Sequence, residues 1–125
     1  MNDTEVILPF IFIGESCIVF YPDKKADVVV QIKNSRPSKN IICSGYRPAF
    51  KVKEDYLTTG VIKFMDRESI NYGEESLAEV WFITPEFYPS CLTVGQVISF
   101  QEGKVVNGYA TIVKIYNKIL EKQNI

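Results

Sequence analysis

Short runs in which apolar and polar residues alternate dominate this chain, and they restrict the folds that it can adopt. The alternation is clearest over residues 28–32, 78–82 and 98–101. A period of two is that of a half-buried β-strand, and no segment sustains the 3.6-residue period of an amphipathic helix. Gly- and Pro-containing breaks separate the runs at short intervals. The sequence therefore predicts an all-β fold, either a small antiparallel β-barrel or a sandwich.

Seven strands are expected in the main body of the chain. We place them at 27–33, 41–46, 50–54, 61–65, 77–83, 97–101 and 106–116. At 125 residues, 46% of them apolar, the chain has the size of one domain and can bury a core. We expect a closed or nearly closed barrel with Val30, Phe82, Ile98 and Phe100 on the inside.

Two β-rich runs precede this body, at 6–13 and 17–21, and the break between them contains Gly14. That spacing predicts a β-hairpin. The first run lacks a basic flank and is too short to span a bilayer, so neither a signal peptide nor a membrane anchor is expected. We divide the chain into a hairpin extension at 1–22, a barrel at 23–116, and a C-terminal tail or short helix at 117–125. An apolar hairpin must be covered, by the barrel edge or by the same segment of a second copy, so a dimer is possible.

Charge is distributed unevenly. Eight of the 14 basic residues but only Asp27 of the 15 acidic ones lie between Lys24 and Lys53, so this segment carries +7 and the remainder carries −8. The segment has two interpretations. It is either a set of solvated strand positions, or a basic stripe with interleaved aromatic residues that binds phosphates or an acidic protein.

Catalytic chemistry has little support in the sequence. The chain has no histidine, so a Ser or Cys nucleophile would lack its usual base. The three cysteines have no metal-ligand spacing, and no phosphate-binding loop occurs. We expect no enzyme activity, no metal and no cofactor. An odd number of cysteines indicates reduced, mostly buried thiols in a cytoplasmic protein.

Residues 45–50, Gly-Tyr-Arg-Pro-Ala-Phe, and a series of later turns match a known pattern. Residues 73–85 and 95–103 follow it at conserved spacing, as do Gly108 and Lys114. In this order the blocks resemble the third, C-terminal β-barrel domain of elongation factor Tu, over about three quarters of the chain. The GTPase part of that factor has no counterpart here. The resemblance implies an antiparallel barrel that presents binding surfaces.

The resemblance also implies positions that contact RNA. In elongation factor Tu this barrel contacts the T stem of tRNA, and the matching positions here are Thr59, Glu102 and Gly103, with Lys39 in place of an upstream basic group. The family's Gln in the first block is replaced by Ala49, which removes a hydrogen-bonding amide.

The residues themselves add three basic candidates. Arg47, between Tyr46 and Pro48, either pairs with a carboxylate across the barrel or binds a phosphate. Lys51 and Lys53 continue the basic segment. Tyr46 is expected to be a half-buried core or rim aromatic in preference to a base-stacking platform.

Two functions follow from these observations. The preferred one is a non-enzymatic protein-binding module, for example an immunity protein that neutralises a nuclease toxin, or a mimic that competes for a partner of a translation factor. The alternative is a translation-associated module that binds RNA or tRNA. Net charge is −1, and the tRNA-contacting positions are incomplete, so protein binding is preferred.

Overall fold

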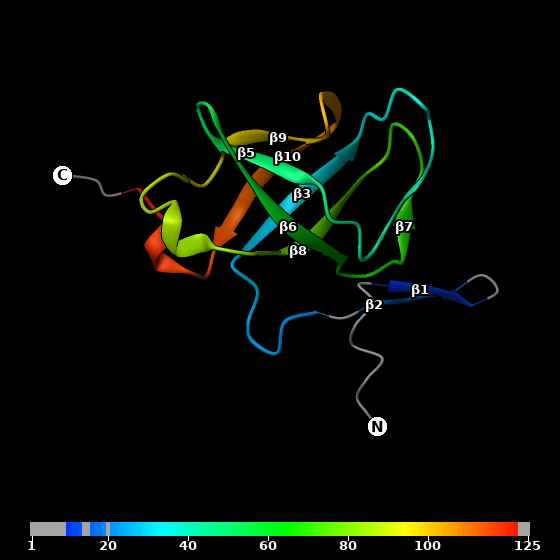
Figure 1. The fold of residues 1–125 in the computed structure, drawn as a ribbon, viewed down its shortest axis with the longest axis horizontal. Helices are drawn as coiled ribbons and strands as arrows, with labels where there is room; N and C mark the ends of the chain where they lie inside the picture. The colour runs from blue at the N-terminus through cyan, green and yellow to red at the C-terminus, as the bar shows by residue number, and fades with distance from the viewer. Residues whose placement is uncertain (1–9, 14–15, 20, 123–125) are drawn as a thin grey trace.

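A closed six-stranded antiparallel barrel forms the body of the protein (Figure 1). The structure, a computed structural model, describes residues 10–13, 16–19 and 21–122. The strands follow one another around the barrel in the order β10-β3-β8-β6-β5-β9. They are β3 (Val28–Asn34), β5 (Ala49–Lys53), β6 (Tyr56–Phe64), β8 (Glu75–Phe82), β9 (Val97–Glu102) and β10 (Val105–Ile115). The predicted all-β class and antiparallel barrel are confirmed.

The barrel interior is filled by the alternate side chains that the sequence pattern assigned to it. Val30, Phe82, Ile98 and Phe100 are all buried, as predicted. Phe50 lies between two of these rings, with its centroid 5.6 Å from those of both Phe82 and Phe100. The Phe50 and Phe82 rings meet edge to face, and such a contact is favourable beyond the area that it buries.

Glycine makes room for these rings at one point where any side chain would collide. A Cβ atom added at Gly108 would overlap the backbone oxygen of Lys33 and the ring of Phe100. The register between β9 and β10 also shifts here, between Val106 and Gly108. Gly108 thus allows β10 to bend around Phe100.

One predicted strand is wrong. Residues 41–46 do not enter the barrel; only β4 (Ile42–Cys43) is extended, and it pairs with β7 (Ser69–Ile70) in a separate two-stranded sheet. Gly45 adopts a φ of 99° and turns the chain, and its N–H donates to Ile62. The apolar residues that suggested a strand instead cover one end of the barrel, where Ile42 and Ile70 are buried.

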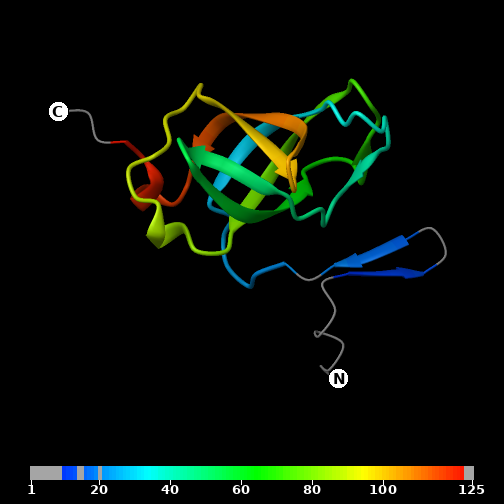
Figure 2. The ribbon, with the colours of Figure 1, turned by 45° about the horizontal axis from the view of Figure 1, so that its top comes forward.

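Two 3₁₀ turns lie near the other end of the barrel, η2 (Pro85–Phe87) and η3 (Lys118–Leu120) (Figure 2). Leu120 is buried, and its carbonyl oxygen accepts hydrogen bonds from the N–H groups of Cys91 and Leu92. The described part of the C-terminal segment thus contains one 3₁₀ turn, at Lys118–Leu120, and this turn is bonded to residues 90–92. Residues 123–125 lie outside the described residues.

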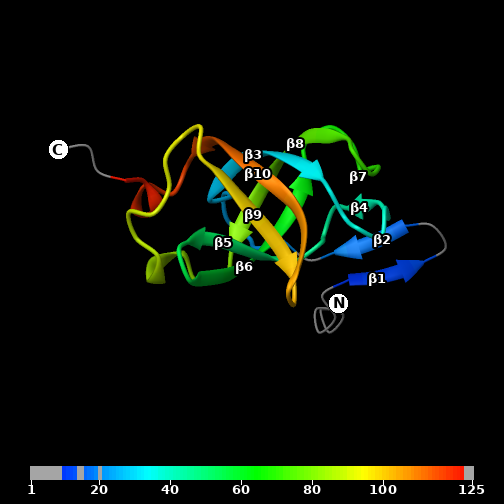
Figure 3. The same cartoon turned by 90° about the horizontal axis from the view of Figure 1, so that it is seen from above.

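Near the N-terminus, β1 (Phe10–Ile13) pairs antiparallel with β2 (Ser16–Val19), outside the barrel wall (Figure 3). The rest of the predicted hairpin, at 6–9, 14–15 and 20, lies outside the described residues. Tyr21 packs on Trp81, with ring centroids 5.5 Å apart, and the two rings form a small apolar cluster with Val61 and Ala26 on the outside of the barrel. No helix in the described ranges has the length and hydropathy needed to cross a membrane.

Candidate binding surface

Strand pairing brings several of the predicted site positions to one outer face. Ala49 pairs with Thr59 of β6 on one side and with Gln101 of β9 on the other. Lys51 lies two residues further along β5, on the same face, and pairs with Leu57. Thr59 and Lys51 are therefore neighbours on the outer face formed by β5 and β6, with the small Ala49 beside them.

Glu102 belongs to a hydrogen-bonded network at the end of this face. Its Oε1 atom accepts a 2.9 Å hydrogen bond from the Nδ2 of Asn107 and lies 3.6 Å from the guanidinium of Arg36. Asn107 is buried and also donates a 2.7 Å hydrogen bond to the hydroxyl of Tyr46. The Glu102 carboxylate therefore already has partners within the chain, and it fixes the β9–β10 hairpin to the turn after β3.

Tyr46 is half-buried in this network, as predicted, and packs against the core. Burial raises the pKa of its hydroxyl; the hydrogen bond from Asn107 opposes this shift, and the nearby charge of Glu102 adds to it. Asn107 was not among the predicted site residues, because no local pattern marks it. Asn107 and Tyr46 are 61 residues apart in the sequence and meet only when the barrel closes.

Lys39 and Gly103 lie at turns, and Arg47 lies in the segment that leads into β5. Lys39 has a φ of 62°, and its ammonium group is 5.7 Å from the centre of the Tyr72 ring. Gly103 turns the β9–β10 hairpin with a φ of 58°, and its carbonyl accepts a hydrogen bond from Gln101. Arg47 is exposed and directly precedes the buried Pro48.

Basic residues do not form one stripe around the barrel. Lys51 and Lys53 are exposed on β5, whereas Lys33 is exposed on β3, three strands away in a ring of six. β3 and β5 are therefore on opposite walls. In the register between β3 and β8, Lys33 lies opposite Glu75. The negative charge of Glu75 offsets the positive charge of Lys33.

Four large apolar side chains are exposed on the β5–β6 hairpin, directly after β8 and in η2. We call this group the apolar face; it consists of Tyr56, Leu57, Ile83 and Phe87, with exposed fractions of 52%, 44%, 63% and 71%. Hydrogen bonds hold their segments together: the Ile83 N–H donates to the carbonyl of Thr59, and the Tyr88 hydroxyl donates to that of Leu57. The rings of Tyr56 and Tyr88, which directly follows η2, also lie 6.2 Å apart between centroids. This surface was not predicted, because the sequence of a short strand does not show whether the fold covers an apolar residue.

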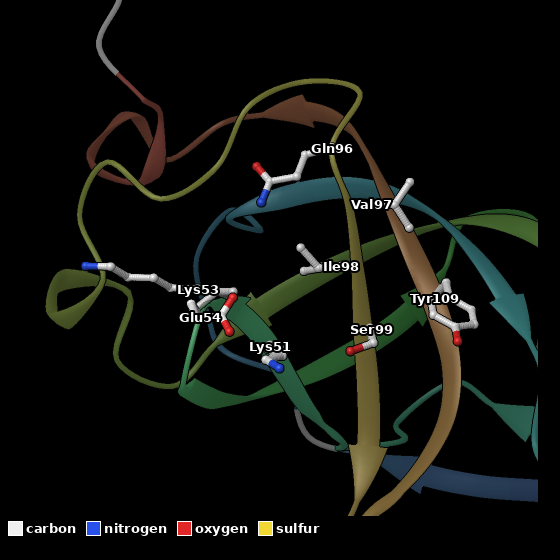
Figure 4. Close-up of a pocket in the computed structure, with 9 residues that line it drawn as sticks. Lys51, Lys53, Glu54, Gln96, Val97, Ile98, Ser99 and Tyr109 are labelled. Atoms are coloured by element: carbon white, nitrogen blue, oxygen red, sulfur yellow. The ribbon is translucent and has the colours of Figure 1, made fainter.

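A surface pocket of about 380 Å³ opens between β5 and β9 (Figure 4). Its lining residues are Lys51, Val52, Lys53, Glu54, Gln96, Val97, Ile98, Ser99 and Tyr109. Two predicted site residues, Lys51 and Lys53, are therefore on its wall. Ser99 and Tyr109 were not predicted as site residues.

In the part of the chain that the structure describes, no three His, Cys, Asp or Glu side chains come together as a metal-ion site would require. Cys91 is buried, and burial raises the pKa of its thiol. A comparison with protein-family models and with curated protein sequences finds no match.

Proposed function

We propose that this protein is a non-enzymatic protein-binding module, related to the third barrel of elongation factor Tu, and that it binds its partner through the apolar face. The observation that carries this proposal is the exposure of Tyr56, Leu57, Ile83 and Phe87 on adjoining segments. Exposed groups of large apolar side chains mark interaction sites, and aromatic anchors supply much of the energy in protein interfaces.

The surroundings of the apolar face suit a protein partner. The short side chain of Ala49 does not extend from the neighbouring surface, whereas a longer polar side chain at this position would project from it. Lys51 and Lys53 lie along the same hairpin as rim charges, and rim charges change the rate of association more than its strength. Candidate partners are a nuclease toxin, which would make the protein an immunity protein, or a translation component for which it competes. The net charge of −8 outside residues 24–53 suits a basic toxin.

The alternative is RNA or tRNA binding, and one observation favours it: Arg47, Lys51 and Lys53 are all exposed on or beside β5. Two observations weigh against it. Lys33 lies on the opposite wall, and the Glu102 carboxylate already bonds to Asn107 and pairs with Arg36. Affinity for nucleic acid depends mainly on the number of phosphates neutralised at once, and a single short basic strand neutralises few.

Affinity capture from native cell extract, with and without ribonuclease, tests this proposal. We expect a captured protein that resists ribonuclease and is lost with Leu57→Glu or Ile83→Glu. Val113→Glu is the matched control, because Val113 is 44% exposed like Leu57 and lies on β10, opposite β6. Capture that needs RNA, or that all three variants weaken equally, would contradict the proposal.

A further inference from the structure

Of the neighbouring strand pairs in the barrel, β5 and β9 have the fewest paired residues. We call the line along which these two strands meet the seam. These strands pair at only two positions, Ala49 with Gln101 and Phe50 with Phe100. In the described chain, no residue of 51–53 pairs with β9, although β5 stays paired with β6 through Lys51 and Lys53. The strands separate beyond Phe50, and the 380 Å³ pocket opens there.

Separated strands present main-chain edges. In an antiparallel sheet, successive residues direct their N–H and C=O groups to alternate sides. Residues 51–53 and 97–99 therefore each direct at least one residue's groups into the seam. A row of main-chain groups without a neighbouring strand is a template for an added strand.

The side chains around the seam form two layers. Val52 and Ile98 point inward and are almost fully buried, at 1% and 4% exposure, and they form an apolar floor. Lys51 and Lys53 flank Val52 in sequence and point outward from the same stretch of β5. Figure 4 shows Lys51, Ile98 and Ser99 around the opening.

The walls of the seam are positively charged. The lining contains Lys51, Lys53 and one acidic residue, Glu54, which leaves a net +1. Neither lysine forms an ion pair within the part of the chain that the structure describes. The Lys53 ammonium instead lies 5.4 Å from the centre of the Tyr56 ring, at the border of the apolar face.

We propose that the seam between β5 and β9 binds an extended segment of the partner protein in which acidic residues alternate with apolar ones. This inference rests on the proposed protein-binding function and adds the chemistry of the segment that is bound. In such a strand, one side carries carboxylates toward Lys51 and Lys53. The other side places apolar side chains over Val52 and Ile98. The main chain bonds to the open edges, as in other cases of strand addition.

Capped synthetic peptides test the proposal on the full chain, by isothermal titration and by amide chemical shifts in NMR spectra. The first probe alternates Val with Glu; the second alternates Val with Lys; the third repeats the Val–Glu peptide with N-methyl groups, which remove main-chain donors. We expect the Val–Glu peptide to bind and to shift the amides of residues 51–53 and 97–99. The other two should bind at least about tenfold more weakly, through lost charge pairing and lost main-chain bonds respectively.

Charge reversal on the protein gives the matching experiment. Lys51→Glu with Lys53→Glu should weaken the Val–Glu peptide about tenfold and should now favour the Val–Lys peptide, a rescue that misfolding cannot produce. Lys104→Glu, at the exposed β9–β10 hairpin, should change neither. Absent binding, equal binding of both charge types, or shifts confined to other residues would overturn the proposal. Ile83→Glu should leave peptide binding intact, so failure of the seam and failure of the apolar face are distinguishable.

Discussion

At the scale of single residues, a buried polar side chain adds hydrogen bonds beyond the strand pairing and ties the C-terminal segment to the barrel. Asp27 is 2% exposed and accepts a 2.7 Å hydrogen bond from the Phe82 N–H and a 2.9 Å bond from the Asn117 side chain. Its backbone carbonyl accepts from Tyr116 and Asn117. One carboxylate thus fixes the start of β3 to the end of β8 and to the C-terminal segment.

Asp27→Ala should therefore destabilise the fold by about 2 to 4 kcal/mol, because it leaves a buried backbone N–H and a side-chain amide without their acceptor. Urea unfolding monitored by Trp81 fluorescence measures this loss. Asp23→Ala, at an exposed position before β3, is the control and should change stability little. An Asp27 variant as stable as the wild type would show that the carboxylate does not hold these segments.

Tyr46 and Cys91 make the free energy of unfolding decrease at alkaline pH. Burial raises both pKa values above their usual 10.0 and 9.0 in the folded protein. Between the unfolded and folded pKa values the unfolded chain binds fewer protons, so the free energy of unfolding decreases as pH rises. This contribution to the free energy of unfolding is complete below pH 9.0 and is lost as pH rises through the pKa values of the folded protein.

Tyr46→Phe should lower stability by about 1 kcal/mol at neutral pH, because Asn107 loses a hydrogen-bond acceptor. It should also reduce the alkaline loss in urea titrations, and an unchanged pH profile would contradict the assignment.

At the scale of elements, the sequence predicted strands well where alternation and burial agree. Six of the seven expected strands are found, because a strand with one face in the core must alternate. The segment 41–46 was wrongly predicted because its apolar residues cover an end of the barrel instead of its interior. Similarly, nothing local to Leu120 shows that it packs into the core.

The C-terminal turn gives a direct test at this scale. Leu120 is 1% exposed, and η3 supplies the carbonyls that bond to Ser90, Cys91 and Leu92. Leu120→Ala should cost about 2 to 5 kcal/mol as a core truncation. Ile119→Ala is the control, because Ile119 is 43% exposed and should cost much less. Equal melting temperatures for the two variants would place this turn outside the cooperative core.

At the scale of the whole molecule, barrel closure decides which predicted site positions meet. Thr59 and Gln101 come together through Ala49, and Glu102 meets Asn107 and Arg36. Lys33 and Lys51 are kept apart on opposite walls. These residues could be predicted from the sequence as surface candidates. Their grouping could not be predicted, because neighbours around a barrel are set by strand order.

The N-terminal segment is expected to belong to the same folding unit. Tyr21 covers Trp81 and Val61 on the outer wall, and the Lys63 ammonium lies 5.2 Å from the centre of its ring. Deleting residues 1–21 would expose that cluster, so we expect a destabilised or insoluble product, measured by thermal unfolding and by sedimentation. A soluble truncation that melts at the wild-type temperature would contradict this expectation.

We propose that the barrel binds protein instead of RNA, and retention of labelled tRNA on filters at physiological salt tests that proposal. We expect binding no tighter than about 10⁻⁶ M, the range of non-specific contact. Submicromolar binding that weakens steeply with salt would contradict it. Replacing Lys51 and Lys53 with Ala would then reduce the log–log salt slope by about 2, if both lysines contact phosphates.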